Sequence, residues 1–330
     1  MRMMNDECRM MKYVNCNSWC VMRVLQIVFA IFISLSFIVP VYSAQDNAGS
    51  NSGISLRFSP SVRAAAMGDA FTAEARGVSA AYYNPAGLGW TEQKELLLSY
   101  QNLVLDVGQG SLGYAHPLSN RSAWAILGQY VNYGSTQRTI VSGTAGAYSG
   151  TFSGQDIAVG ISYGAKMGNW GYGVTAKILS SEIDNTSEID NTSATAFAGD
   201  IGLRWQADNS PLAFGIAVNN LGTELKYDRE AERLPILFRA GASWEAIHKR
   251  LIITGDLEKV VDENWSGHAG AEFKLGDMFA FRAGYDGSVE IDNGLTLGAG
   301  FKTNGLELDY AFIPFGKVGD NHRVGLSYKF

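Results

Sequence analysis

The chain has 330 residues, with 26 basic and 32 acidic side chains, and charged residues make up only 18% of it. Glycine (38 residues) and aromatic residues (12%) are abundant, and the mean hydropathy is close to zero. A bundle of membrane-spanning helices is excluded, because it would be strongly hydrophobic, and the acidic balance argues against nucleic acid as a partner.

Residues 1–44 are predicted to be an export signal. Lys12 and Arg23 precede an apolar run at 24–39, and small residues near position 44 offer a cleavage region. These are the features of a secretory signal peptide, although the apolar run is long enough that a membrane anchor is the alternative. Cleavage would leave 22 basic and 30 acidic side chains and remove all three cysteines. The mature chain is therefore predicted to have no disulfide and no thiolate metal site, and no cofactor is predicted.

Residues 45–92 are predicted to form a compact hatch or plug ahead of a barrel. Small residues dominate this segment, and glycines interrupt its short stretches of helical spacing. In "YYNPAGL" the asparagine side chain can accept a hydrogen bond from the backbone two residues on, and the proline fixes φ in a turn. The alternative is a periplasmic cap that merely closes the barrel. The candidate hatch motif consists of Gly68, Asn84, Pro85, Ala86 and Gly87.

Residues 93–330 are predicted to form an all-β fold, which is a transmembrane antiparallel β-barrel of about 14 strands. Short segments with a period of two follow one another, separated by turn signals such as "SNRS", "GNW" and "TNG". Segments of about ten residues suit tilted strands that cross a bilayer, whereas strands in a soluble sandwich usually have about five or six.

The alternation gathers charges of both signs on one face of the strands. A soluble sandwich would turn these charges to water, whereas a membrane barrel encloses them in its lumen and turns the apolar face to lipid. The pattern alone fits both folds, but the export signal, the strand length and the aromatic strand ends favour the barrel. The predicted lumen charges either pair across strands and stiffen the barrel or form an ion-selective constriction. They are Arg239, Glu272, Arg282, Glu307, Asp309 and Arg323.

The last strand ends on Tyr328 and Phe330, which we interpret as the signal read by the barrel-assembly machinery. Lipid offers no hydrogen bonds, so this strand must pair with the first. Tight turns alternate with longer loops, and the tight turns are expected to face the periplasm, so that the N-terminus enters and the C-terminus ends on that side. The longer loops, expected to face outside, are 134–152, 182–194, 222–233 and 286–293.

The run from "RAAAMGDAFTA" through "SAAYYNPAGL" resembles the start of the PorV/PorQ family, within the wider FadL-like group of outer-membrane barrels. "GIAVNNLGTEL", "LPILFRAGASW" and "HRVGLSYKF" resemble the same family. The resemblance implies a 14-stranded barrel with an N-terminal hatch, surrounded by lipid in the outer membrane of a Gram-negative (diderm) bacterium.

The resemblance implies two non-enzymatic functions. One is association with type IX secretion, with secretion-system proteins or their cargo as partners. The other is passage of long-chain fatty acids or other hydrophobic small molecules. The polar inward positions weaken the transport hypothesis, whereas loops 134–152 and 222–233 offer a surface for partner proteins.

An enzyme is not predicted. No serine stands in a nucleophile motif beside any of the four histidines, and the strand glycines precede no helix that could bind phosphate. The histidines are His116, His248, His268 and His322.

Overall fold

The computed structural model describes residues 52–103, 106–142, 145–183, 192–208, 210–227, 230–247, 250–289, 293–316 and 319–330. The predicted export signal at residues 1–44 lies outside these ranges. Among the described residues, no helix is both long and apolar enough to cross a membrane.

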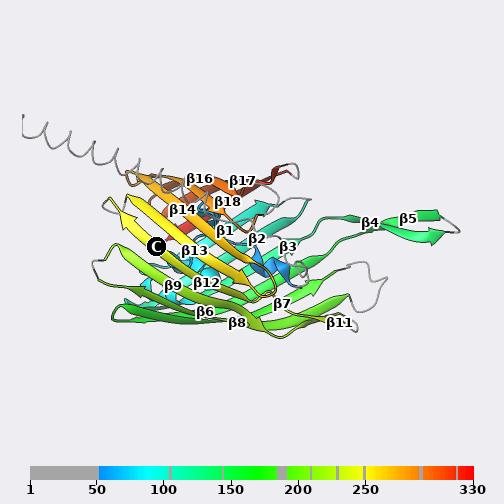
Figure 1. Ribbon diagram of the computed structural model, residues 1–330, viewed down its shortest axis with the longest axis horizontal. Helices are drawn as coiled ribbons and strands as arrows, with labels where there is room; N and C mark the ends of the chain where they lie inside the picture. Colours follow the sequence, from blue (N-terminus) through cyan, green and yellow to red (C-terminus); the bar gives the residue numbers. More distant parts are fainter. Residues whose placement is uncertain are drawn as a thin grey trace, which may run out of the picture. The chain divides into compact units, whose positions relative to one another are not determined.

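Fourteen strands close into an antiparallel barrel in which neighbouring strands follow one another along the chain (Figure 1). This confirms the predicted fold class. The strands are β1 (Glu95–Asn102), β2 (Gly108–Ser119), β3 (Ser122–Asn132), β6 (Gln155–Met167), β7 (Trp170–Glu182), β8 (Ser193–Gln206), β9 (Leu212–Gly222), β12 (Leu237–Ala246), β13 (Leu251–Val260), β14 (Trp265–Leu275), β15 (Phe279–Asp286), β16 (Leu295–Thr303), β17 (Leu306–Pro314) and β18 (Asp320–Lys329).

The two ends of the barrel differ in their connections. At one end, which we call the tight-turn end, two residues suffice to join strands, as at 120–121, 168–169 and 304–305. At the other, the hairpin end, the chain adds two separate two-stranded sheets. These hairpins were not predicted, and they consist of β4 (Thr136–Ser142) with β5 (Ala145–Phe152), and β10 (Leu225–Tyr227) with β11 (Glu230–Glu232).

The first and last strands close the barrel. β1 pairs with β18 without a break, from Glu95 opposite Lys329 to Asn102 opposite His322. Along β1, buried and exposed positions alternate strictly, and the exposed ones include Leu96, Leu98 and Tyr100. An outer wall of large apolar side chains around a polar interior is the pattern of a barrel immersed in lipid.

Five short helices precede the barrel and form the hatch, residues 52–92. They are η1 (Ile54–Arg57), α2 (Val62–Ala65), η2 (Gly77–Ser79), α3 (Ala80–Tyr83) and η3 (Pro85–Trp90). The hatch supplies the lumen with a small apolar core, because Met67, Phe71 and Tyr83 are fully buried there.

The hatch passes through the lumen from the hairpin end to the tight-turn end. The Ser52 amide donates to the Arg233 carbonyl, just after β11 (3.1 Å), and the Trp90 ring lies 5.5 Å from the Lys166 ammonium near the end of β6. For the described residues, the prediction that the N-terminal region enters from the tight-turn side is therefore wrong. Because the number of strands is even, β1 begins at the same end of the barrel at which β18 stops. The number of strands does not determine the path of the chain before β1.

Glycines in the wall allow the hatch backbone to approach closely. A Cβ atom at Gly173 of β7 would collide with the backbone of Pro85 and Ala86. A Cβ atom at Gly284 of β15 would collide with the backbone of Met67 and Gly68. These glycines are needed for space, since neither has a positive φ.

We predict that Gly173→Ala lowers the free energy of unfolding by about 1–3 kcal/mol, the usual cost of overpacking a core. Denaturant unfolding of the full chain in detergent micelles would measure the loss. Gly110→Ala in β2 is the matched control, because its added methyl would meet no atom within 4 Å. Equal effects of the two changes would contradict the close packing of hatch against wall.

Candidate functional site

The "NPAG" motif fastens the hatch to the wall near the tight-turn end. The Asn84 side-chain amide donates to the carbonyls of Thr72 (3.1 Å) and Leu203 (3.0 Å), and its Oδ1 accepts from the Ala86 amide (3.1 Å). Asn84 is fully buried, so these bonds satisfy a polar group that has no access to water. One side chain thus joins two segments of the hatch to β8.

The residues around Asn84 complete this attachment. Pro85 opens η3, and a Cβ atom at Gly87 would collide with the Ala75 carbonyl. Gly68 has φ 64°, a left-handed conformation that favours glycine, and its amide donates to the Thr296 hydroxyl (3.1 Å). The predicted motif residues therefore lie in two places, Gly68 against β16 and the others against the wall near β8.

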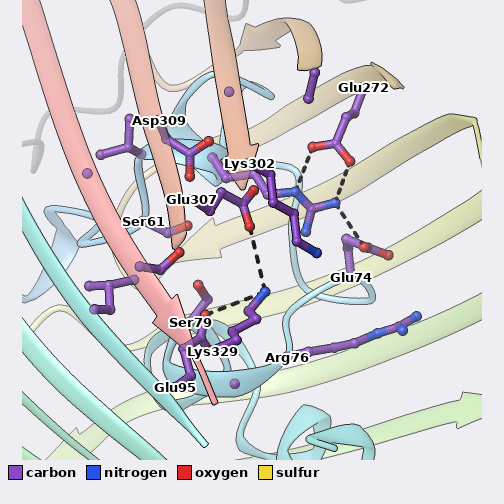
Figure 2. Close-up of a pocket in the computed structure, with 18 of the residues that line it drawn as sticks. Ser61, Glu74, Arg76, Ser79, Glu95, Glu272, Lys302, Glu307, Asp309 and Lys329 are labelled. Atoms are coloured by element: carbon purple, nitrogen blue, oxygen red, sulfur yellow. Dashed lines mark hydrogen bonds and ion pairs between the residues drawn. The ribbon is translucent and has the colours of Figure 1, made fainter. Parts of the chain in front are cut away.

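Glu272 of β14 is the centre of the charged network in the lumen (Figure 2). Its two oxygens accept from Nε (2.7 Å) and Nη2 (2.9 Å) of Arg63, a bidentate pair, and one also accepts from Nε of Arg282 (2.7 Å). The side chains of Glu272 and Arg282 are each only 1% exposed. Burial on this scale makes an unpaired charge very costly, so each of these groups depends on its partners.

The network extends from Arg282 along the wall and from Arg63 into the hatch. Arg282 reaches Asp309 (2.5 Å) and Glu307 (3.4 Å) on β17. Arg63 also contacts Glu74 within the hatch (3.1 Å), and Glu74 in turn accepts from the Ser243 hydroxyl of β12. An ion pair to β14 and a hydrogen bond to β12 thus link the hatch to two nearby strands of the wall.

The other two predicted lumen arginines do not join this network. Arg239 pairs with Glu258 (3.0 Å), and its guanidinium lies over the rings of Tyr82 (5.4 Å) and Tyr83 (5.0 Å). Arg323 faces the lumen opposite Gln101 of β1 and, among the described residues, makes no ion pair with the three predicted acids. The expectation that all three arginines pair with Glu272, Glu307 and Asp309 therefore holds for Arg282 alone.

Arg63 and Glu74 were missed in the sequence. They lie in the small-residue hatch, where nothing in the strand periodicity draws attention to them. The signal that could have identified Arg63 is its isolation, as the single charge among the small and apolar residues from Ser59 to Gly68.

A polar cavity of about 920 Å³ occupies the tight-turn end of the lumen, where residues of the hatch and of the wall line it together. Lys329 lies there between Glu95 (3.8 Å) and Glu307 (3.7 Å), and Figure 2 shows it reaching toward both. Arg63, Glu74 and Glu272 line the same cavity. Its walls carry charges of both signs, a lining that suits water and ions better than a hydrocarbon.

The hairpin end of the lumen is closed by apolar contacts. Leu56 of η1 packs with Leu179 of β7, Leu225 of β10 and Leu234, and all four are buried. These contacts place the β10–β11 hairpin and the start of the hatch together over this end.

Asp156, at the start of β6, anchors the same region. It accepts from the hydroxyls of Ser55 (2.5 Å) and Tyr133 (2.8 Å). Burial, and next the nearby Asp156 carboxylate, raise the pKa of Tyr133 above its usual value.

A serine, a histidine and an aspartate stand in line near the hairpin end. Ser266 Oγ lies 3.1 Å from Nε2 of His268, whose Nδ1 lies 3.2 Å from Asp286 and 2.9 Å from the Gly68 carbonyl. Because Nδ1 faces two acceptors, it must carry a proton. His268 therefore connects the hatch at Gly68 to β14 and β15. No sequence motif predicts this arrangement.

The remaining predicted residues lie on the outside of the barrel. Tyr328 and Phe330 stack on each other (5.4 Å between ring centroids), and the Lys94 ammonium lies 5.7 Å from the Phe330 ring. His116 stacks on Trp124 and His322 on Tyr310. His248 lies outside the described residues.

We predict that Glu272→Ala lowers the free energy of unfolding by about 3–5 kcal/mol, because it removes a carboxylate partner from the buried Arg282 and the partly buried Arg63. Lys274→Ala, two residues along the same strand, is the control. The Lys274 side chain is 42% exposed and 3.5 Å from Glu272, so its loss should cost at most about 1 kcal/mol. Denaturant titration of both variants in detergent is the measurement, and similar losses would show that the buried network does not stabilise the barrel.

Comparisons with solved structures identify the same barrel fold in hydrocarbon transporters. The toluene transporter TodX of P. putida is 11% identical, with a TM-score of 0.64 over 82% of this chain and 98% of its own. The toluene transporter TbuX of Ralstonia pickettii is 13% identical, with a TM-score of 0.58 over 83% of this chain and 98% of its own. At such low identity, the likeness concerns the fold alone.

A search of the curated proteins found no match. The family model described as type IX secretion system protein PorV matches residues 43–261, which include the hatch and the strands from β1 to β13. The match covers more than half of the chain, and the protein therefore belongs to the PorV family, within a FadL-like barrel fold.

Proposed function

We propose that this protein acts in the outer membrane as a non-enzymatic, PorV/PorQ-type component of type IX secretion that binds partner proteins or cargo. The observation that carries the proposal is that the lumen is blocked. The hatch spans it, the Arg63–Glu272–Arg282 network fixes the hatch to the wall, and apolar contacts close the hairpin end. A barrel blocked in this way is suited to presenting its outer loops rather than to conducting solutes.

An outer-membrane location is supported by the exterior of the barrel. Large apolar side chains cover the outer face of β1, and aromatic residues such as Phe330 and Trp170 stand at strand ends, with 55% and 57% of their surface exposed. Aromatic girdles at the interfaces and an apolar band between them are features of outer-membrane barrels.

The alternative function is FadL-like transport of long-chain fatty acids or other hydrophobic compounds. The fold likeness to TodX and TbuX favours it, and so does the apolar cluster around Leu56 and Leu225. The charged cavity at the tight-turn end argues against it, because a hydrocarbon passing through the lumen would have to cross charged groups such as Arg63 and Glu272.

Site-specific photo-crosslinking in cells tests the partner-binding function. With the photoreactive amino acid at Tyr148, on the β4–β5 hairpin, we expect cross-links to type IX secretion components or their exported cargo. With it at Leu98, on the lipid-facing wall, we expect none. Tyr148 is 67% exposed and Leu98 53%, so the two positions differ in location more than in accessibility. Absence of such proteins at both positions, together with co-purified hydrophobic compounds, would favour the transporter instead.

The absence of enzymatic activity is tested at Ser266, the serine aligned with His268 and Asp286. We expect a fluorophosphonate probe to leave Ser266 unlabelled in the folded barrel, because His268 is engaged by the Gly68 carbonyl in holding the hatch. Mass spectrometry of the treated protein makes the measurement, with Ser266→Ala as the blank. Labelling that depends on both Ser266 and His268 would overturn the non-enzymatic proposal.

A further inference from the structure

Most carboxylates that line the tight-turn cavity already have partners. Glu272 and Asp309 pair with arginines of the buried network. Glu307 lies 3.7 Å from the Lys329 ammonium, and Glu95 lies 3.8 Å from it. The interior of the cavity therefore has little unpaired negative charge to attract a cation.

Two basic side chains that line the same cavity lack such partners. Lys302 of β16 stands opposite Glu307 of β17 in the register, yet it forms no ion pair with any residue that the structure describes. Arg250, just before β13, likewise forms none in the described part of the chain, and the two residues before it, His248 and Lys249, are not acidic. Figure 2 shows the Lys302 side chain reaching into the cavity. The charge left uncompensated here is therefore positive.

A third cation, Lys274, lies beside Arg250. The Lys274 amide donates to the Arg250 carbonyl (2.8 Å), which continues the pairing of β13 with β14 from Leu251 opposite Phe273. Like charges directly opposite each other on neighbouring strands are destabilising. Lys274 does contact Glu272 (3.5 Å), but that carboxylate already serves two arginines. An anion placed between Lys274 and Arg250 would relieve their repulsion.

These cations make one side of the cavity mouth basic. We call them the basic arc, which consists of Arg250, Lys274 and Lys302. Asp277, in the turn after β14, is an acid within the arc. The acids that flank the arc on other strands are engaged, because Glu245 at the end of β12 pairs with Arg76 (3.0 Å) and Glu95 of β1 shares Lys329 with Glu307.

The spacing and lining of the arc suit an acidic polypeptide. Pockets for small molecules are lined mostly by apolar groups, whereas charged side chains of both signs line this cavity of about 920 Å³. β14 and β16 are separated by two strand spacings, about 10 Å, so one carboxylate cannot reach both Lys274 and Lys302. In an extended chain, residues three positions apart are also about 10 Å apart. Two acids so placed match the arc.

We propose that the basic arc binds an acidic segment of a second polypeptide that enters the cavity at the tight-turn end. One carboxylate of the segment would lie between Arg250 and Lys274, and another would lie at Lys302. This inference rests on the proposed partner-binding function, and it specifies the charge of the partner segment and the end of the barrel that receives it.

Fluorescence anisotropy with two labelled peptides tests the proposal on the full chain in a non-ionic detergent. Both peptides are serine-glycine sequences; one carries two glutamates three positions apart, and the other carries glutamines there. We expect the glutamate peptide to bind more tightly, and added salt to weaken its binding. Lys302→Gln should weaken binding by about 2- to 5-fold, the range of an exposed ion pair, and Lys302→Glu should weaken it further because it adds repulsion.

Lys226→Glu is the matched control, because Lys226 is an exposed lysine on β10 at the hairpin end. It changes the net charge equally and should leave the affinity unchanged. A photoreactive group on the glutamate peptide should cross-link to the turn at 276–278 and not to the β10–β11 hairpin. Equal binding of both peptides, equal effects of Lys302→Glu and Lys226→Glu, or cross-links confined to the hairpin end would each overturn the inference.

Competition with succinate distinguishes a polypeptide from a small dicarboxylate. We expect succinate at the peptide's own concentration to leave the glutamate peptide bound. Displacement by succinate at that concentration would assign the site to a small molecule, and the polypeptide proposal would be wrong.

The outcomes separate this inference from the proposed function. If Tyr148 cross-links to secretion proteins but the glutamate peptide does not bind, the basic arc is not a peptide site and the proposed function stands. If the glutamate peptide binds at the arc but no secretion protein is cross-linked, the arc is an acidic-peptide site and the proposed function is wrong.

Discussion

Backbone hydrogen bonding in lipid is the constraint on which the rest of this structure depends. A peptide group that meets hydrocarbon has no water to bond with, and each unpaired group costs several kcal/mol. A sheet with two free edges is therefore unstable in the membrane, and pairing of β1 with β18 removes both edges at once. Closure then gives the sheet an inside and an outside, and the period of two assigns every residue to one of them.

The enclosed interior creates the second requirement, because charges in it are largely removed from water. Glu272 and Arg282 are almost completely buried, and on the wall Arg282 must serve Glu307 and Asp309 as well as Glu272. The hatch contributes the missing partner, Arg63, which binds Glu272 through two nitrogens. The segment that blocks the lumen is thus also the one that makes its charges tolerable. The wall glycines that admit the hatch, such as Gly173 and Gly284, belong to the same arrangement.

Outside the membrane, the need for backbone partners is met differently. Within the barrel every strand has two neighbours, but the β4–β5 hairpin continues only one pair of them. In water a sheet of two strands is tolerated, because solvent can bond to peptide groups that have no strand partner.

Much of this architecture was predictable from the sequence because the signals are local. Alternation of apolar and polar residues, as from Leu306 to Phe312, identifies a strand and its two faces without knowledge of its neighbours. The "YYNPAGL" turn likewise depends on residues next to one another. The β4–β5 hairpin was missed because the stretch around β5 is rich in glycine, serine and threonine and lacks a clear alternation. The β10–β11 hairpin was missed because its strands have only three residues each.

The sequence by itself determined the number of barrel strands, the faces they present and the compact character of the hatch, since each follows from spacing along a single segment. Only the tertiary structure decided which charges meet, because pairing depends on strand order, register and the route of the hatch. For this reason Arg282 joins the acids of β14 and β17, whereas Arg239 pairs with Glu258 and stacks on two hatch tyrosines. The entry of the hatch from the hairpin end was decided in the same way, by contacts between residues far apart in the chain, such as Ser55 with Asp156.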